Sequence, residues 1–181
     1  SYKKYTVTYF LMLFTLFAGV ILTGFGSAFY HYAPNNFTLI FDRLPMTLVF
    51  TSFFAIIISD YVDRRLGAWV FYLFLMIGVY SILYWYYTEI MGEGDLRLYA
   101  FVQFFPIVAG PLILLIYKGK PQYTRRMVYV FAAYIVAKLF EHYDQLVLAL
   151  TGFISGHTIK HLISALAVYF IFILYREDIK E

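Results

Sequence analysis

Long apolar segments dominate this sequence and limit the folds that it can adopt. Six of them, each about 20 residues long, are separated by short turn-forming or charged clusters. A helix of that length crosses about 30 Å of hydrocarbon, and 62% of the residues are hydrophobic while only 14% are charged. The sequence therefore predicts an all-α integral membrane protein, a bundle of six transmembrane helices. The predicted helices are Thr6–His31, Asp42–Val62, Gly67–Thr88, Leu96–Tyr117, Arg125–Leu150 and His157–Arg176.

The connections between these segments are short, which forces neighbouring helices to run antiparallel. We therefore expect an up-and-down bundle that forms a single transmembrane domain over residues 1–181. The chain has no cysteine, so disulfides, thiolate nucleophiles and Cys-ligated metal sites are excluded. The first apolar run is too long for a signal peptide and predicts a spanning helix.

Lysine and arginine are distributed unevenly between the two sides of the predicted bundle. Most of the 14 basic residues fall on the side that holds both termini, whereas only Arg43 and Arg97 fall on the other. The positive-inside rule makes the first side cytoplasmic, so both termini are predicted in the cytoplasm. No basic patch indicates a nucleic-acid partner. The lack of cysteine and the short loops favour a bacterial inner membrane, and an organelle membrane with the same topology is the alternative. The basic residues on the first side are Lys3, Lys4, Arg64, Arg65, Lys118, Lys120, Arg125, Arg126, Arg176 and Lys180.

Five polar residues are predicted at the non-cytoplasmic end of the bundle. Ser27 and His31 end the first helix, and Asp42 begins the second. His157 and His161 begin the sixth. The i,i+4 spacing within each helix stacks two side chains on one face, about 5–6 Å apart. The three histidines form a ligand set suited to Zn²⁺ with an open fourth position, which leaves Asp42 to act as a base.

Each of these residues also has a plainer interpretation. Asp42 is placed to cap the second helix. Ser27 lies beside Gly24 and Gly26, where small residues let membrane helices approach closely. Histidines on membrane helices also ligate haem. Ionisable side chains inside spanning segments are costly and tend to be functional or paired, which favours the metal site.

A second polar group lies near the outer end of the fifth predicted helix. It comprises Lys138, Glu141, His142 and Asp144. We expect its acids and lysine to form ion pairs and His142 to anchor the helix at the membrane interface. A supporting contact to the metal ligands is the alternative role for one of them.

The spacing of the five candidate residues is similar to that of a known family. Ser27-x-x-x-His31, Asp42 eleven residues later and His157-x-x-x-His161 resemble the alkaline ceramidases. These enzymes belong to a superfamily of membrane hydrolases that includes the adiponectin-receptor and hemolysin III proteins. The run that starts at Asp42, DRLPM, is similar to a D-E-L-P-M element of the ceramidase branch, with Arg43 in place of the acidic residue.

The resemblance runs from the family's second helix to its seventh, so the six predicted helices correspond to the seven-helix fold lacking its first helix. Either that helix precedes the given residues or the protein makes do with six. The acidic segment that binds calcium in some ceramidases is not among the given residues, and we expect no calcium site from those present. The resemblance implies a zinc-dependent membrane amidase whose substrate is a ceramide-like lipid amide.

In that interpretation His31, His157 and His161 hold Zn²⁺, and Asp42 acts first as general base and then as general acid. Ser27 donates a hydrogen bond to the developing oxyanion. Two alternatives stay open. One is a zinc-containing, lipid-sensing receptor without turnover, and the other is a haem-binding membrane subunit.

Overall fold

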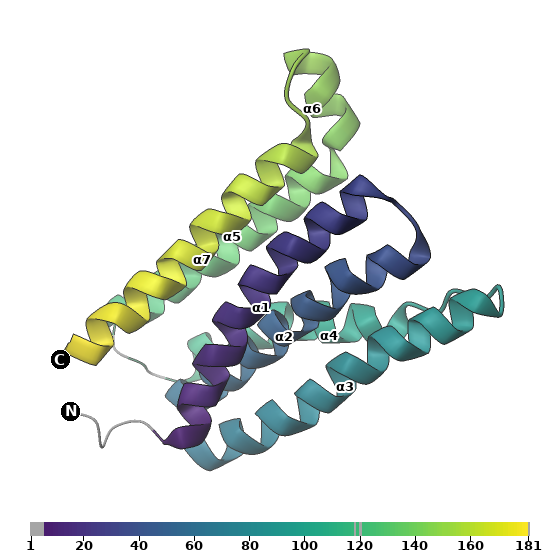
Figure 1. Ribbon diagram of the computed structural model, residues 1–181. Coiled ribbons are helices and arrows are strands. Elements are labelled where there is room, and N and C mark those ends of the chain that lie inside the picture. The colour runs from purple at the N-terminus through teal and green to yellow at the C-terminus, as the bar shows by residue number, and fades with distance from the viewer. Residues whose placement is uncertain (1–5, 118, 120, 181) are drawn as a thin grey trace. The chain divides into compact units, whose positions relative to one another are not determined.

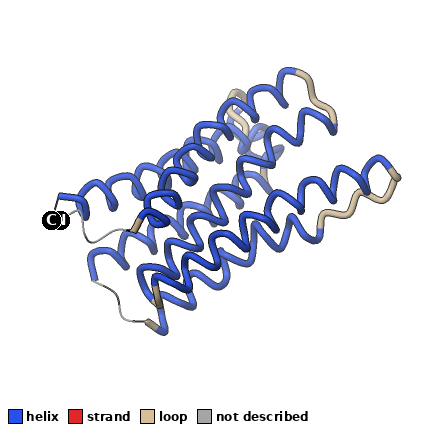
Figure 2. The backbone as a smooth tube through the Cα atoms, turned by 60° about the horizontal axis from the view of Figure 1, so that its bottom comes forward, coloured by secondary structure: helices blue, strands red, loops and turns tan. Residues whose placement is uncertain are grey.

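The computed structural model describes residues 6–117, 119 and 121–180, and within them every regular element is a helix (Figures 1 and 2). Five of the described helices, α1–α4 and α7, are long and apolar enough to cross a membrane. The predicted class, an all-α membrane protein, is confirmed. The helices are α1 (Val7–Tyr32), α2 (Asn36–Tyr61), α3 (Arg64–Ile90), α4 (Arg97–Ile116), α5 (Pro121–His142), α6 (Asp144–Thr151) and α7 (Gly156–Lys180).

The fifth predicted helix is divided into two helices in the structure. The sequence predicted one helix over Arg125–Leu150, but the structure breaks it at Tyr143 into α5 and α6. α5 is 22 residues long, enough to cross the hydrocarbon, yet it falls outside the set of apolar helices. Arginines near its start and Lys138 and Glu141 near its end place charges in every long stretch of it.

The start of the second helix also differs from the prediction. α2 begins at Asn36 and not at Asp42, because Asn35 accepts a hydrogen bond from the Thr38 amide while the Thr38 hydroxyl accepts one from the Asn35 amide. This reciprocal capping box satisfies the first free amides of the helix. Asp42 therefore lies inside α2, and its predicted alternative role as the N-cap is wrong.

The described chain falls into two compact units, Tyr2–Lys118 and Gly119–Glu181. We call them the N-terminal and C-terminal units and describe each by itself. The single domain over residues 1–181 stays a prediction.

α2 forms the centre of the N-terminal unit and packs against α1, α3 and α4. Its second half is buried almost without interruption from Phe50 to Ile58. Phe54 and Ile58 of α2 pack with Phe74 of α3 in one cluster of this core. A central helix surrounded by others is apolar on all sides, which explains why α2 shows no single apolar face.

The C-terminal unit is an antiparallel pair, α5 and α7, with the short α6 at the end where α5 stops and α7 starts (Figure 1). Gly152 ends α6 with a φ of +75°, a left-handed conformation that glycine adopts without strain. Gly156 opens α7 against the end of α5, since a Cβ there would lie 2.1 Å from the Phe140 carbonyl oxygen. The α5–α7 pair therefore closes tightly at this end.

Candidate functional site

Two histidine side chains converge in the first turns of α7. The Nε2 atoms of His157 and His161 lie 3.0 Å apart, and the two rings meet edge to face with centroids 4.8 Å apart. His157 is half-buried and His161 is exposed. The i,i+4 stacking predicted from the sequence is therefore confirmed.

The separation of these nitrogens fits two ligands of one metal ion. Ligand nitrogens about 2.0–2.1 Å from a tetrahedral Zn²⁺ lie about 3.3 Å from each other. The observed 3.0 Å is close to that value, so the two nitrogens are near enough to each other to bind one ion. The same distance also allows one neutral ring to donate an Nε2–H to the other.

Hydrogen bonds from outside α7 fix the turn that carries His157. The His157 amide donates to Oδ1 of Asp144 at 2.7 Å, and the Thr158 amide donates to Oγ of Ser155 at 3.1 Å. Two free amides at the start of α7 are thereby satisfied. Asp144 was predicted to form ion pairs, but it serves as a cap that joins α6 to α7. A partner 13 residues away leaves no local pattern in the sequence.

Glu141 forms ion pairs with two lysines near the start of α7. Its Oε2 lies 2.6 Å from Nζ of Lys138 in the same helix, and its Oε1 lies 2.7 Å from Nζ of Lys160 in α7. The predicted pairing within this polar group is confirmed for Glu141. The bond to Lys160, the residue before His161, also holds α7 in register with α5.

In the N-terminal unit, α1 and α2 approach each other closely at Gly26 and Phe41, the residues that precede Ser27 and Asp42. A Cβ on Gly26 would lie 1.8 Å from the Phe41 carbonyl oxygen and 3.1 Å from the Asp42 amide nitrogen. Only glycine allows this contact. The predicted packing role of the small residues is thus confirmed for Gly26, and it sets the turn that carries Ser27 against the turn that carries Asp42.

Ser27 and Asp42 both keep their side-chain polar atoms unengaged. Among the described residues neither side chain has a hydrogen bond or ion pair, although Ser27 is only 9% exposed. Several other helical hydroxyls in this unit donate to their own backbone, as Thr23 does to the Gly19 carbonyl oxygen at 2.8 Å. A buried hydroxyl and a carboxylate on neighbouring helices, both without a hydrogen-bond partner among the described residues, are groups suited to binding a polar group of a ligand.

His31 lies in the last turn of α1, one turn after Ser27, and its side chain is exposed. Its ring lies against that of Tyr30, with centroids 5.5 Å apart. His31 belongs to the N-terminal unit, whereas the other two histidines belong to the C-terminal unit. The three-histidine ligand set therefore stays a prediction.

Arg43 is a polar residue whose surroundings the sequence did not reveal. Its guanidinium carbon lies 4.4 Å from the centroid of the Trp85 ring and 5.3 Å from that of Tyr99. Its Nη1 atom is buried without a hydrogen-bond partner. A charged residue within an apolar helix was the available signal, since such residues are rarely placed without a purpose.

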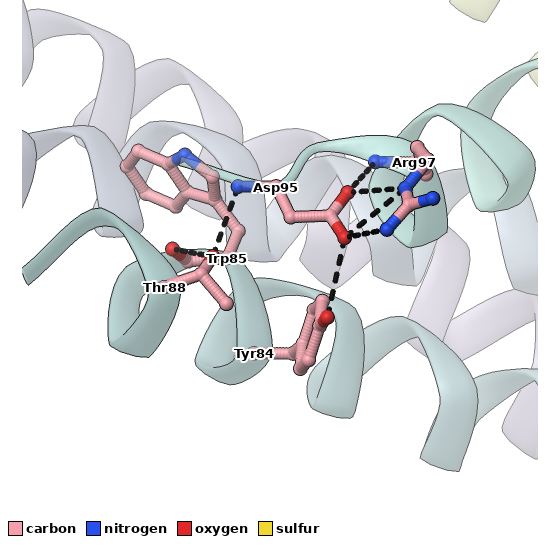
Figure 3. A network of polar contacts seen from close by, with 5 residues as sticks. All are labelled: Tyr84, Trp85, Thr88, Asp95 and Arg97. Carbon is pink, nitrogen blue, oxygen red and sulfur yellow. Dashed lines mark hydrogen bonds and ion pairs between the residues drawn. The ribbon is translucent and has the colours of Figure 1, made fainter. Parts of the chain in front are cut away.

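A network centred on Asp95 fixes the turn between α3 and α4 beside Trp85 (Figure 3). Its carboxylate accepts bonds from Nε and Nη2 of Arg97, at 3.0 and 2.7 Å, and from the Tyr84 hydroxyl at 3.2 Å. The Asp95 amide donates to Oγ1 of Thr88 at 2.9 Å. The Arg97 guanidinium, by its hydrogen bonds, holds the pKa of the Asp95 carboxyl well below its usual range.

Comparisons with protein-family models, with curated proteins and with solved structures found no match to this chain.

Proposed function

We propose that this chain is a zinc-dependent amidohydrolase of the membrane that cleaves a ceramide-like lipid amide to a fatty acid and an amine. The observation that carries the proposal is the convergence of the His157 and His161 Nε2 atoms to 3.0 Å, close to the spacing of two zinc ligands. His31 is the proposed third ligand. A zinc ion held by three imidazoles would act as a Lewis acid and make a bound water nucleophilic near neutral pH.

Membrane topology supports the participation of His31. If α5 also spans, the chain crosses the membrane between the end of α4 and the start of α7, and α7 then begins on the face where α1 ends. The length of α5, 22 residues, suits a crossing, and its charges at Lys138 and Glu141 are paired with each other. With this threading the charge asymmetry gives cytoplasmic termini and a metal site toward the non-cytoplasmic side.

Asp42 and Ser27 supply the proton transfer and the oxyanion contact in this proposal. As the water oxygen attacks the amide carbon, Asp42 takes one of its protons. The Ser27 hydroxyl donates a hydrogen bond to the carbonyl oxygen as negative charge develops there. The C–N bond then breaks, and Asp42 passes its proton to the departing amine. The products are the fatty acid and the free amine, and the carboxylate of Asp42 is regenerated.

The geometry of the pair speaks against the haem alternative. Two axial haem ligands approach the iron from opposite faces of the porphyrin, which requires histidines that face each other across the ring. His157 and His161 stack on one face of one helix with touching rings. Such a pair leaves no room for a macrocycle between its nitrogens.

The proposal is tested by measuring release of fatty acid from ceramides by the purified chain in detergent with added zinc. Asp42→Asn keeps the size of the side chain but cannot take a proton, so we expect at least a hundredfold loss of rate, about the contribution of general acid–base catalysis. The matched control is Glu93→Gln, an exposed carboxylate in the α3–α4 turn. Full activity of Asp42→Asn would refute the role of Asp42. Zinc bound without any hydrolysis of ceramides would favour the receptor alternative.

A further inference from the structure

The Arg43 guanidinium lies inside the helix bundle of the N-terminal unit, between two aromatic rings. Arg43 comes from α2, Trp85 from α3 and Tyr99 from α4. Trp85 and Tyr99 are 3% and 8% exposed, so both rings are fixed by packing. The guanidinium carbon sits over both rings, at 4.4 and 5.3 Å from their centroids, within the range of a cation–π interaction.

These contacts leave the hydrogen-bonding capacity of Arg43 unused. An arginine stays charged in proteins and carries five N–H donors in one plane. Among the described residues Arg43 makes no hydrogen bond or ion pair, and its Nη1 is fully buried. Stacking on aromatic rings occupies the faces of the guanidinium but satisfies none of its N–H groups. A buried charged donor without an acceptor is costly, which makes a bound acceptor favourable.

From this geometry we infer that Arg43, Trp85 and Tyr99 form a binding site for the carboxylate of a long-chain fatty acid. The edge of the guanidinium would donate to the two carboxylate oxygens, the paired arrangement that arginine forms with planar oxyanions. The apolar helix surfaces of the unit would accommodate the acyl chain. The inference rests on the proposed function in one respect, because it assigns a site to the acid product of that reaction.

The local charge balance favours a carboxylate over a phosphate. Arg43 and Arg97 are the arginines at this end of the unit. Arg97 is held by Asp95 at 2.7 Å, and among the described residues the neighbouring Asp42 carboxylate forms no ion pair with Arg43. One unengaged guanidinium matches one negative charge. A phosphate monoester carries about 1.5 to 2 negative charges at pH 7 and would leave part of its charge buried and unpaired. A carboxylate is therefore the better match.

The fluorescence of Trp85 can report binding directly. The chain has two tryptophans, and Trp69 is 77% exposed, so Trp69→Phe leaves Trp85 as the single reporter. The full chain with this change is titrated with palmitate in a neutral detergent while tryptophan emission is recorded. Methyl palmitate, palmityl phosphate and inorganic phosphate are titrated in parallel. The series is repeated with His157→Ala added, which separates this site from any binding of the carboxylate to a metal.

We expect a saturable change in Trp85 emission with palmitate. Methyl palmitate should bind at least about tenfold more weakly than palmitate, as expected for the loss of a charge-assisted hydrogen bond. Arg43→Gln should weaken palmitate binding by a similar factor, and Arg43→Lys should fall between because it keeps the charge without the planar fork. Arg65→Gln, which removes an exposed arginine, should bind as the parent does.

Equal binding of palmitate and its methyl ester to the parent chain would overturn the inference, even if the Arg43 variants fail to fold. Tighter binding of palmityl phosphate or of inorganic phosphate than of palmitate would also overturn it. These outcomes are distinct from a failure of the proposed function. Palmitate binding that depends on Arg43 would stand in a chain that hydrolyses no amide, and hydrolysis would stand without palmitate binding.

Discussion

The Nε2 atoms of His157 and His161 lie 3.0 Å apart, one helical turn from each other at the start of α7. If both nitrogens bind zinc, His157→Ala and His161→Ala should each remove a ligand and lower the zinc content of the purified protein at least tenfold. His142→Ala is the matched control, because that histidine ends α5 and its ring contacts the neighbouring Tyr143. Metal analysis after dialysis measures the difference. Unchanged zinc in both variants would rule out the metal site.

Gly26 should be required for the packing of α1 on α2, and Gly24 should not. A Cβ at position 26 would lie 1.8 Å from the Phe41 carbonyl oxygen, whereas one at position 24 meets no atom within 4 Å. We expect Gly26→Ala to cost about 1–3 kcal/mol, the usual range for overpacking. Gly24→Ala should be neutral or slightly stabilising. Thermal unfolding in detergent compares them.

The same two variants separate packing from chemistry at Ser27 and Asp42. Since the Gly26 contact fixes how the turns that carry Ser27 and Asp42 pack, Gly26→Ala should also lower the proposed hydrolysis. Equal melting temperatures for the position 24 and 26 variants would contradict the tight crossing.

The cap on α7 should depend on the acceptor oxygen of Asp144 more than on its charge. Asp144→Ala leaves the His157 amide without its 2.7 Å acceptor and should cost about 1 kcal/mol of stability. Asp144→Asn keeps a side-chain oxygen and should lose less. Because the capped turn carries His157, the alanine variant should also bind zinc more weakly. An equal loss in both variants, measured by thermal unfolding, would instead point to the charge.

The helices were predictable from the sequence because burial in lipid or in a bundle demands long apolar stretches. The break between the first two helices was also predictable from the Pro34-Asn35 turn signals. The residue at which this break ends and the second helix begins was not predictable. The capping box of Asn35 and Thr38 starts α2 at Asn36, whereas the sequence pattern predicts its start at Asp42.

The candidate site was predictable only where one helix supplies the geometry. The i,i+4 spacing of His157 and His161 follows from helical periodicity. The contacts of Arg43 do not follow from periodicity. Trp85 and Tyr99 lie 42 and 56 positions after Arg43 in the chain and contact it only because three helices pack together. The cap that Asp144 forms on α7 likewise depends on the turn made by α6.

The turn between α3 and α4 should lose stability in acid through Asp95. The side chain of Asp95 is 13% exposed, and hydrogen bonds from the Arg97 guanidinium lower its pKa. A carboxyl whose pKa is lower in the folded than in the unfolded protein stabilises the fold above the unfolded value, about 3.9. The contribution is lost as the pH falls below that value toward the folded pKa.

The Asp95→Asn variant tests this pH dependence directly. At neutral pH the parent should unfold at a higher temperature than Asp95→Asn, because the variant lacks the charged acceptor of the bonds from Arg97 and Tyr84. Below about pH 4 the parent carboxyl binds protons on unfolding, so the difference between the two melting temperatures should shrink. Glu93→Gln, two residues earlier and exposed, should show no such convergence. A difference that stays constant from pH 7 to about pH 3 would show that Asp95 stabilises the turn by packing and not by its charge.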